Sequence, residues 1–142
     1  MLYLDTGCLV KLYYPEPETA RAAAKTAGRR IVFNPLHNLE FTSAMRLKVF
    51  RREATDDQVR ATLRLVEQDI SAGKLIIIDN INGTTLQTAI ELANQHSAET
   101  GCRSLDTLHC SLALHLGIEG FLSTDSRQHA LARLIHLPLL DL

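Results

Sequence analysis

The chain begins with Tyr3-Leu4-Asp5-Thr6-Gly7-Cys8-Leu9-Val10-Lys11-Leu12-Tyr13, preceded only by Met1 and Leu2, and this stretch decides the fold. Its first part, residues 2–4, is a short apolar run that Asp5 and Thr6 bring to an end, which predicts a buried strand. Residues 7–14 then have the pattern of a helix. A strand that leads directly into a helix is the first half of a strand–helix–strand unit, and the rest of the chain repeats this order.

Short apolar runs alternate with longer helical patterns along the remaining sequence. Further strands are predicted at residues 31–33, 75–78, 121–123 and 136–140. Helices are predicted up to about Ala27, from Asn34 to about Arg52, from Thr55 to near Gly73, from about Thr84 to Glu99, from a Ser104 cap to Gly117, and from Ser126. This alternation predicts one α/β domain over residues 1–142, a three-layer α/β/α arrangement around a five-stranded, mainly parallel sheet.

The composition is ordinary for a globular protein, with 46% hydrophobic and 22% charged residues and a formal net charge of −1. Because the chain is not basic overall, any contact with a nucleic acid must come from local patches. No apolar stretch approaches the ~20 residues of a membrane span, and the first residues do not resemble a signal peptide, so we expect a cytoplasmic protein without a membrane partner. Cys8, Cys102 and Cys110 lack the close spacing of a zinc site, which predicts free buried thiols.

Acidic residues follow the predicted strands or lie near the start of predicted helices. Four predicted strands lead into Asp5, Asp79, Asp125 and Asp141, and two further acids on helices are Glu40 and Asp106. In open parallel sheets, functional sites form beyond the carboxyl ends of the strands. An aspartate at such a position is also common as a turn residue or helix cap, and sequence spacing does not show which acids converge.

Four segments resemble the motifs of PIN domains, in particular those of VapC-like toxins. They are residues 3–13, 38–44, 103–109 and 122–127, in the order that the family has along the chain. The resemblance implies the strand order 3-2-1-4-5, in which Asp5 and Asp125 are neighbours and Asp79 lies two strands from the first. Two departures affect the surroundings of the acids: Gly7 replaces the small polar residue that the family more often has, and no Asn separates Thr124 from Asp125.

The resemblance implies an acid cluster of Asp5, Glu40, Asp106 and Asp125. Asp5, Asp106 and Asp125 are expected to bind Mg²⁺, with Mn²⁺ as an alternative, either directly or through water. Glu40 is expected to be a further ligand or to orient the attacking water. Carboxylate oxygens suit such hard cations.

Residues next to the acids have two interpretations each. Thr6 and Thr124 either cap the helices that follow or hold a carboxylate in place. His109 either packs within its helix or donates a hydrogen bond toward the acids. Arg103 and Arg127 either contact the phosphate of a substrate or pair with a carboxylate.

The function implied by the resemblance is that of a metal-dependent endoribonuclease, the toxin of a type II toxin–antitoxin pair. RNA would be the substrate, a small antitoxin protein would cover the acid groove, and the toxin would form a homodimer. Three alternatives remain: a PIN nuclease of RNA processing outside such a pair, a catalytically silent binding module on the same fold, and a receiver-type signalling domain. The last is disfavoured by the lack of an acidic pair after the first strand.

Overall fold

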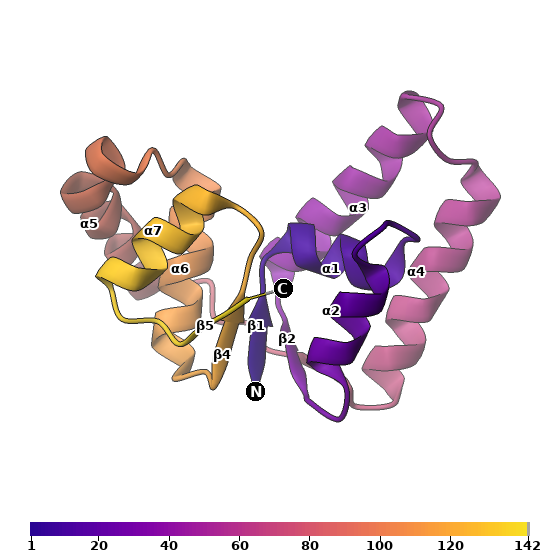
Figure 1. Cartoon of the computed structure of the whole chain (residues 1–142), viewed down its shortest axis with the longest axis horizontal. Coiled ribbons are helices and arrows are strands. Elements are labelled where there is room, and N and C mark those ends of the chain that lie inside the picture. The colour runs from indigo at the N-terminus through magenta and orange to yellow at the C-terminus, as the bar shows by residue number, and fades with distance from the viewer. Residues whose placement is uncertain (142) are drawn as a thin grey trace.

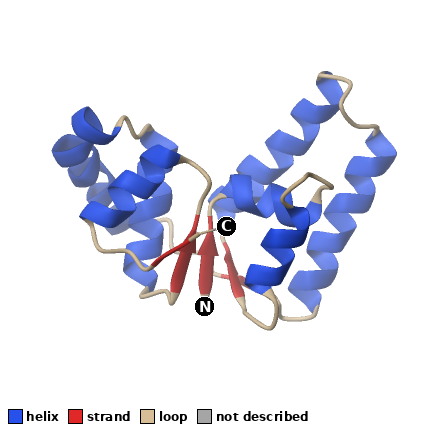
Figure 2. Cartoon of the chain, viewed as in Figure 1, coloured by secondary structure: helices blue, strands red, loops and turns tan. Residues whose placement is uncertain are grey.

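The computed structural model describes residues 1–141, so that Leu142, the last residue of the predicted domain, lies outside the described part. Five strands and seven helices form within it (Figures 1 and 2). The strands are β1 (Leu2–Leu4), β2 (Ile31–Phe33), β3 (Leu75–Ile77), β4 (Gly120–Leu122) and β5 (Leu139–Leu140). The helices are α1 (Thr6–Tyr13), α2 (Thr19–Thr26), α3 (Pro35–Phe50), α4 (Asp56–Ser71), α5 (Gly83–Thr100), α6 (Ser104–Leu116) and α7 (Ser126–Leu134).

The strands form one sheet in the order β3-β2-β1-β4-β5, and every pairing in it is parallel. This confirms the predicted sheet and its strand order. In the register between β1 and β4, Leu4 lies opposite Leu122. Asp5 and Ser123 therefore leave the sheet side by side, at the carboxyl ends of the central strand β1 and its neighbour β4.

Helices cover both faces of the sheet, with α1 to α4 on one side and α5 to α7 on the other (Figure 1). The alternation of side chains along β1 explains this division. Leu2 and Leu4 pack into the core formed with α1, α3 and α4. Tyr3 faces the opposite way, into the core formed with α6 and α7. The three-layer architecture predicted from the sequence is confirmed.

Some boundaries differ from the predictions. The last strand is limited to residues 139–140, and the predicted first residue of this strand, His136, has a positive φ of 57°, which an extended strand does not allow. Helix α6 is capped by Arg103 rather than Ser104: the backbone of Arg103 is extended, and its N–H donates to the Asp106 carboxylate. The predicted cap at Ser104 is therefore wrong, and Ser104 is the first helical residue.

The cysteines and the lengths of the helices test two further predictions. The three cysteines are buried free thiols, as predicted. Within residues 1–141, every helix is either too short or too polar to cross a membrane.

Candidate active site

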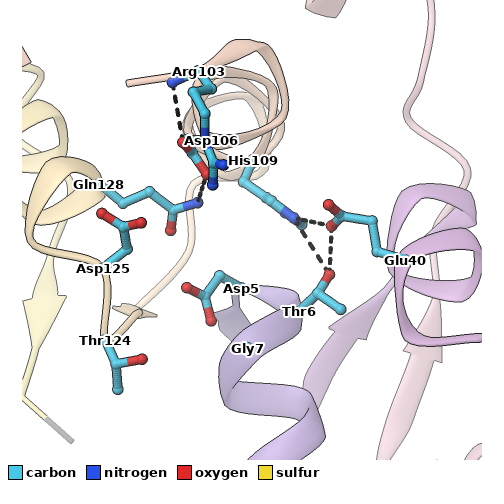
Figure 3. Close-up of a pocket in the computed structure, with 10 residues that line it drawn as sticks. All are labelled: Asp5, Thr6, Gly7, Glu40, Arg103, Asp106, His109, Thr124, Asp125 and Gln128. Carbon is cyan, nitrogen blue, oxygen red and sulfur yellow. Dashed lines mark hydrogen bonds and ion pairs between the residues drawn. The ribbon is translucent and has the colours of Figure 1, made fainter. Parts of the chain in front are cut away.

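A pocket of about 360 Å³ lies beyond the carboxyl ends of β1 and β4, between the two helical layers (Figure 3). Its lining residues are Asp5, Thr6, Gly7, Glu40, Arg103, Asp106, His109, Thr124, Asp125 and Gln128. All four acids of the predicted cluster thus line one pocket, although they come from four separate segments. Asp79 and Asp141 do not line it, because β3 and β5 are the outer strands of the sheet.

Asp5 is held from two sides. It is the N-cap of α1, where its Oδ1 accepts a hydrogen bond from the backbone N–H of Cys8 at 2.7 Å. Its Oδ2 accepts a hydrogen bond from the Ser123 hydroxyl at 2.6 Å. The carboxylate is therefore fixed by its own helix and by the end of β4. Sequence analysis did not identify Ser123, because only the pairing of β1 with β4 brings it to Asp5.

Gly7 lies beside the Asp5 carboxylate, at the position where the family more often has a small polar residue. A Cβ at this position would lie 3.4 Å from Oδ1 of Asp5, in ordinary van der Waals contact. The pocket would accommodate a small polar residue there, but in this chain the hydroxyl that bonds Asp5 comes from Ser123.

Asp125 is the N-cap of α7 and forms an ion pair with Arg127. Its Oδ1 accepts hydrogen bonds from the backbone N–H of Arg127 at 2.8 Å and from Nε at 3.1 Å, and its Oδ2 accepts one from Nη2 at 2.6 Å. These hydrogen bonds lower the pKa of Asp125 to about 2. In the described structure Arg127 thus pairs with a carboxylate, the second of its two interpretations.

Asp106 lies in the first turn of α6 and contacts residues on both sides of the pocket. Its Oδ2 accepts hydrogen bonds from the backbone N–H of Arg103 at 3.0 Å and from the guanidinium Nε at 3.3 Å. Its Oδ1 accepts a long hydrogen bond, 3.4 Å, from Nε2 of Gln128. The other amide atom, Oε1 of Gln128, is buried and has no hydrogen-bond partner among residues 1–141. Gln128 lines the pocket although the sequence motifs did not indicate it.

Glu40 lies in the second turn of α3, on the opposite wall. Its Oε2 accepts hydrogen bonds from the Thr6 hydroxyl and from Nε2 of His109, each at 2.6 Å (Figure 3). Partial burial raises the pKa of Glu40, but the two hydrogen bonds outweigh this effect, and the pKa lies below its usual value. Glu40 is therefore ionised at neutral pH.

Three further pocket residues lie next to the acids: Thr6, Thr124 and His109. Neither threonine caps a helix, since Asp5 and Asp125 occupy the N-cap positions. Thr6 holds the Glu40 carboxylate instead, whereas Thr124 is exposed at the rim of the pocket. His109 is buried, and it also bonds the acid site directly, so both of its interpretations apply.

The pocket is acidic even after its ion pairs are counted. Four carboxylates surround it, and Arg103 and Arg127 pair with two of them. Among residues 1–141, no three His, Cys, Asp or Glu side chains are close enough to enclose one metal ion in this arrangement. The arginines offset the repulsion between neighbouring carboxylates, and the remaining negative charge favours a cation.

Comparisons with known proteins agree with this fold. A family model described as the PIN domain matches residues 2–134. Among solved structures, the chain is similar to VapBC2 from Rickettsia felis bound to a DNA fragment from their promoter, with 18% identity and a TM-score of 0.65. That match covers 99% of this chain and 98% of the other. No match was found among curated protein sequences.

Two further solved structures have the same fold. One is Mycobacterium tuberculosis VapC20, a toxin that cleaves the sarcin–ricin loop, with 13% identity and a TM-score of 0.67 over 92% of this chain and 94% of that one. The other is FitAcB from Neisseria gonorrhoeae, with 16% identity and a TM-score of 0.67 over 99% of this chain and 96% of that one. At these identities, the similarity shows a shared fold.

Proposed function

The chain belongs to the PIN-domain family, and from this premise we propose that it is a divalent-metal-dependent endoribonuclease, the toxin of a toxin–antitoxin pair. The observation that carries the proposal is the convergence of Asp5, Glu40, Asp106 and Asp125 on one pocket. A receiver-type domain is disfavoured, because its sheet has the order 2-1-3-4-5 and this sheet has the order 3-2-1-4-5.

The residues of the pocket fit a magnesium or manganese ion by their chemistry. Asp5, Asp106 and Asp125 offer carboxylate oxygens, and Gln128 adds a buried carbonyl oxygen that has no hydrogen-bond partner within residues 1–141. Mg²⁺ takes few protein carboxylates and keeps several waters, so the ion does not require three carboxylates in direct contact. These four residues would hold it. When bound, the ion would neutralise charge on a phosphate and acidify water.

The remaining pocket residues have separate tasks. Glu40 is ionised, and its Oε2 is occupied by Thr6 and His109. Its other oxygen, Oε1, would accept a hydrogen bond from a water molecule and so orient that water toward the phosphate. Arg103 is 71% exposed beside Asp106, which suits it to hold a phosphate of the RNA.

The toxin role and the antitoxin partner are supported by the structural relatives. These relatives include a toxin that cleaves the sarcin–ricin loop and VapBC2 bound to promoter DNA. A groove beside the acid pocket suits a partner protein: Leu39, Ser43, Ala44, Leu47 and Leu105 line it together with Glu40. Leu39 is 68% exposed and Leu105 is 45% exposed. We propose that an apolar segment of the antitoxin covers this groove. The homodimer remains a prediction.

Cleavage of RNA by the purified protein tests the nuclease proposal. We expect cleavage with Mg²⁺ or Mn²⁺, none with EDTA, and none in Asp5→Asn or Asp106→Asn. Asp79→Asn is the matched control, because Asp79 also follows a strand but lies outside the pocket. Loss of activity in the control as well, or full activity in EDTA, would contradict the proposal, and a wild type inactive on every RNA would favour the silent module.

Expression in cells tests the toxin role. We expect the wild type to stop growth, Asp5→Asn to be harmless, and co-expression of the protein encoded beside this gene to restore growth. Leu39→Asp should weaken binding of that protein, whereas Leu86→Asp, on the exposed face of α5, should not. An active nuclease with no effect on growth would favour the RNA-processing alternative.

A further inference from the structure

A buried chain of hydrogen bonds leads from the start of α3 to the acid pocket. It joins Asn34, Tyr3, His109 and Glu40, which come from the start and second turn of α3, from α6 and from the central strand β1. Asn34, Tyr3 and His109 are each at least 98% buried. Only the last two members of the chain line the pocket, so the first two have no role in the function proposed above.

The orientation of the Asn34 amide is fixed by its role as the N-cap of α3. Its Oδ1 accepts a hydrogen bond from the backbone N–H of His37 at 3.0 Å. Since a backbone N–H can only donate, the atom that faces it must be the oxygen. The amide nitrogen Nδ2 therefore points the other way, and it donates to the Tyr3 hydroxyl at 3.3 Å.

The Tyr3 hydroxyl accepts the hydrogen bond from Asn34 and donates the next one to His109. Burial raises the pKa of Tyr3 far above its usual value, so the phenol keeps its proton. Its oxygen accepts from Asn34, and its single proton is left for Nδ1 of His109, 2.9 Å away. With Nδ1 as an acceptor, the neutral ring carries its proton on Nε2. That N–H donates to Oε2 of Glu40 at 2.6 Å.

Asn34 also fixes the tautomer of His37. The backbone N–H of Asn34 donates to Nδ1 of His37 at 3.2 Å, so Nε2 carries the proton and donates to the carbonyl oxygen of Leu4 at 2.8 Å. One helix start thus decides the tautomers of two buried histidines, whose ring centroids are 5.2 Å apart. One of them supports the end of β1 and the other reaches Glu40.

We propose that Asn34 and Tyr3 form a relay that fixes His109 as its Nε2–H tautomer, and that His109 thereby holds Oε2 of Glu40 and leaves Oε1 for the pocket. Asn34, Tyr3 and His109 are positioning residues, because they act through Glu40. Their effect on catalysis rests on the proposed nuclease function, whereas the tautomer does not. If the three residues served only to fill the core, the direction of these hydrogen bonds would be of no consequence.

NMR of protein labelled with ¹⁵N in its histidines tests the relay without any activity. In the wild type we expect His109 to be protonated at Nε2 and not at Nδ1. In Tyr3→Phe, which keeps the ring and loses the hydroxyl, Nδ1 of His109 loses its donor, so its signal should shift towards that of a ring nitrogen without a hydrogen bond. The spectrum of His37 should stay unchanged, because Asn34 sets it directly, and this serves as the internal control. A wild-type ring protonated at Nδ1 would overturn the relay, as would a Tyr3→Phe spectrum identical to the wild type.

Two substitutions of His109 separate positioning from packing. The amide of Gln reaches approximately the place of Nε2 and can donate to Glu40, whereas that of Asn matches Nδ1 and can only bond Tyr3. We expect kcat to fall about tenfold further in His109→Asn than in His109→Gln, the equivalent of one lost hydrogen bond, with KM unchanged. Both variants lose the ring, so equal losses of kcat would mean packing and overturn the proposal. An inactive wild type would refute the nuclease function and leave the NMR result to decide the relay.

Discussion

The hydroxyl of Ser123 lies 2.6 Å from Oδ2 of Asp5, although 118 residues separate the two in the sequence. The same hydroxyl accepts a hydrogen bond from the backbone N–H of Asp125 at 2.9 Å. Ser123 is fully enclosed, with 1% of its surface exposed. One buried side chain thus connects two of the acids that we propose to bind the metal, at the ends of the paired strands β1 and β4.

Ser123→Ala should weaken metal binding without unfolding the protein. Asp5 would keep its hydrogen bond from the backbone of Cys8 but lose the one that orients Oδ2. Removing a group that orients a metal ligand typically costs about 10–100-fold in affinity. Isothermal titration calorimetry with Mn²⁺ measures the affinity. Ser71→Ala, on the exposed end of α4, is the control, and equal affinities in the two variants would contradict the prediction.

Divalent metal should raise the melting temperature. Carboxylates gathered in one pocket repel one another, and a bound cation removes that cost only in the folded state. At a metal concentration of 100 times Kd the stabilisation is about 2.7 kcal/mol, which corresponds to about 5–10 °C for a domain near this size. Differential scanning calorimetry with Mg²⁺ and with EDTA gives the shift. It should vanish in Asp106→Asn and persist in Asp79→Asn, and its persistence in both would count against the site.

Arg103→Gln should weaken RNA binding more than it slows the chemical step. The side chain is mostly exposed beside Asp106, and losing one phosphate contact raises KM and lowers the dependence of log K on log salt by about 1. Cleavage kinetics at several salt concentrations provide both values. Arg64→Gln changes the net charge equally from an exposed position on α4 and should have no such effect. An unchanged KM in Arg103→Gln would leave Arg103 only as the partner of Asp106.

The free energy of unfolding should decrease as the pH is lowered below about 6.5, because His37 is buried in its neutral form. Burial, with the neighbouring His109 adding to it, lowers the pKa of His37 well below its usual 6.5. Between the two pKa values the unfolded chain binds a proton that the folded chain excludes, so acid favours unfolding. The free energy of unfolding should therefore drop by about 1.4 kcal/mol per pH unit from this one residue, and the effect is absent above pH 6.5.

Urea unfolding of the metal-free protein between pH 5 and 7 measures this slope. His37→Gln removes the titrating ring, so its slope should be smaller by one proton, whatever its absolute stability. Parallel curves for the two proteins would show that His37 takes up its proton in the folded state, contrary to the prediction.

The architecture could be predicted from local signals in the sequence. Short apolar runs at residues 2–4 and 31–33, separated by helical patterns, carry their own signal, because strand and helix periodicities are local properties. The family motifs added the strand order and the four acids. The local signal was weaker at chain ends and caps: neither the short β5 nor the cap at Arg103 could be read from propensity, since the first depends on the backbone of His136 and the second on the Asp106 side chain.

The hydrogen bonds that hold the acids in place arise from long-range packing. Ser123 reaches Asp5 through the register of two strands, Gln128 reaches Asp106 from another helix, and Asn34 directs His109 through Tyr3. Each of these contacts joins residues that are distant in sequence, so no local pattern encodes them. Short stretches of the sequence identify the acidic residues that can form a pocket. The direction of each hydrogen bond in the pocket depends on how segments distant in the sequence pack together.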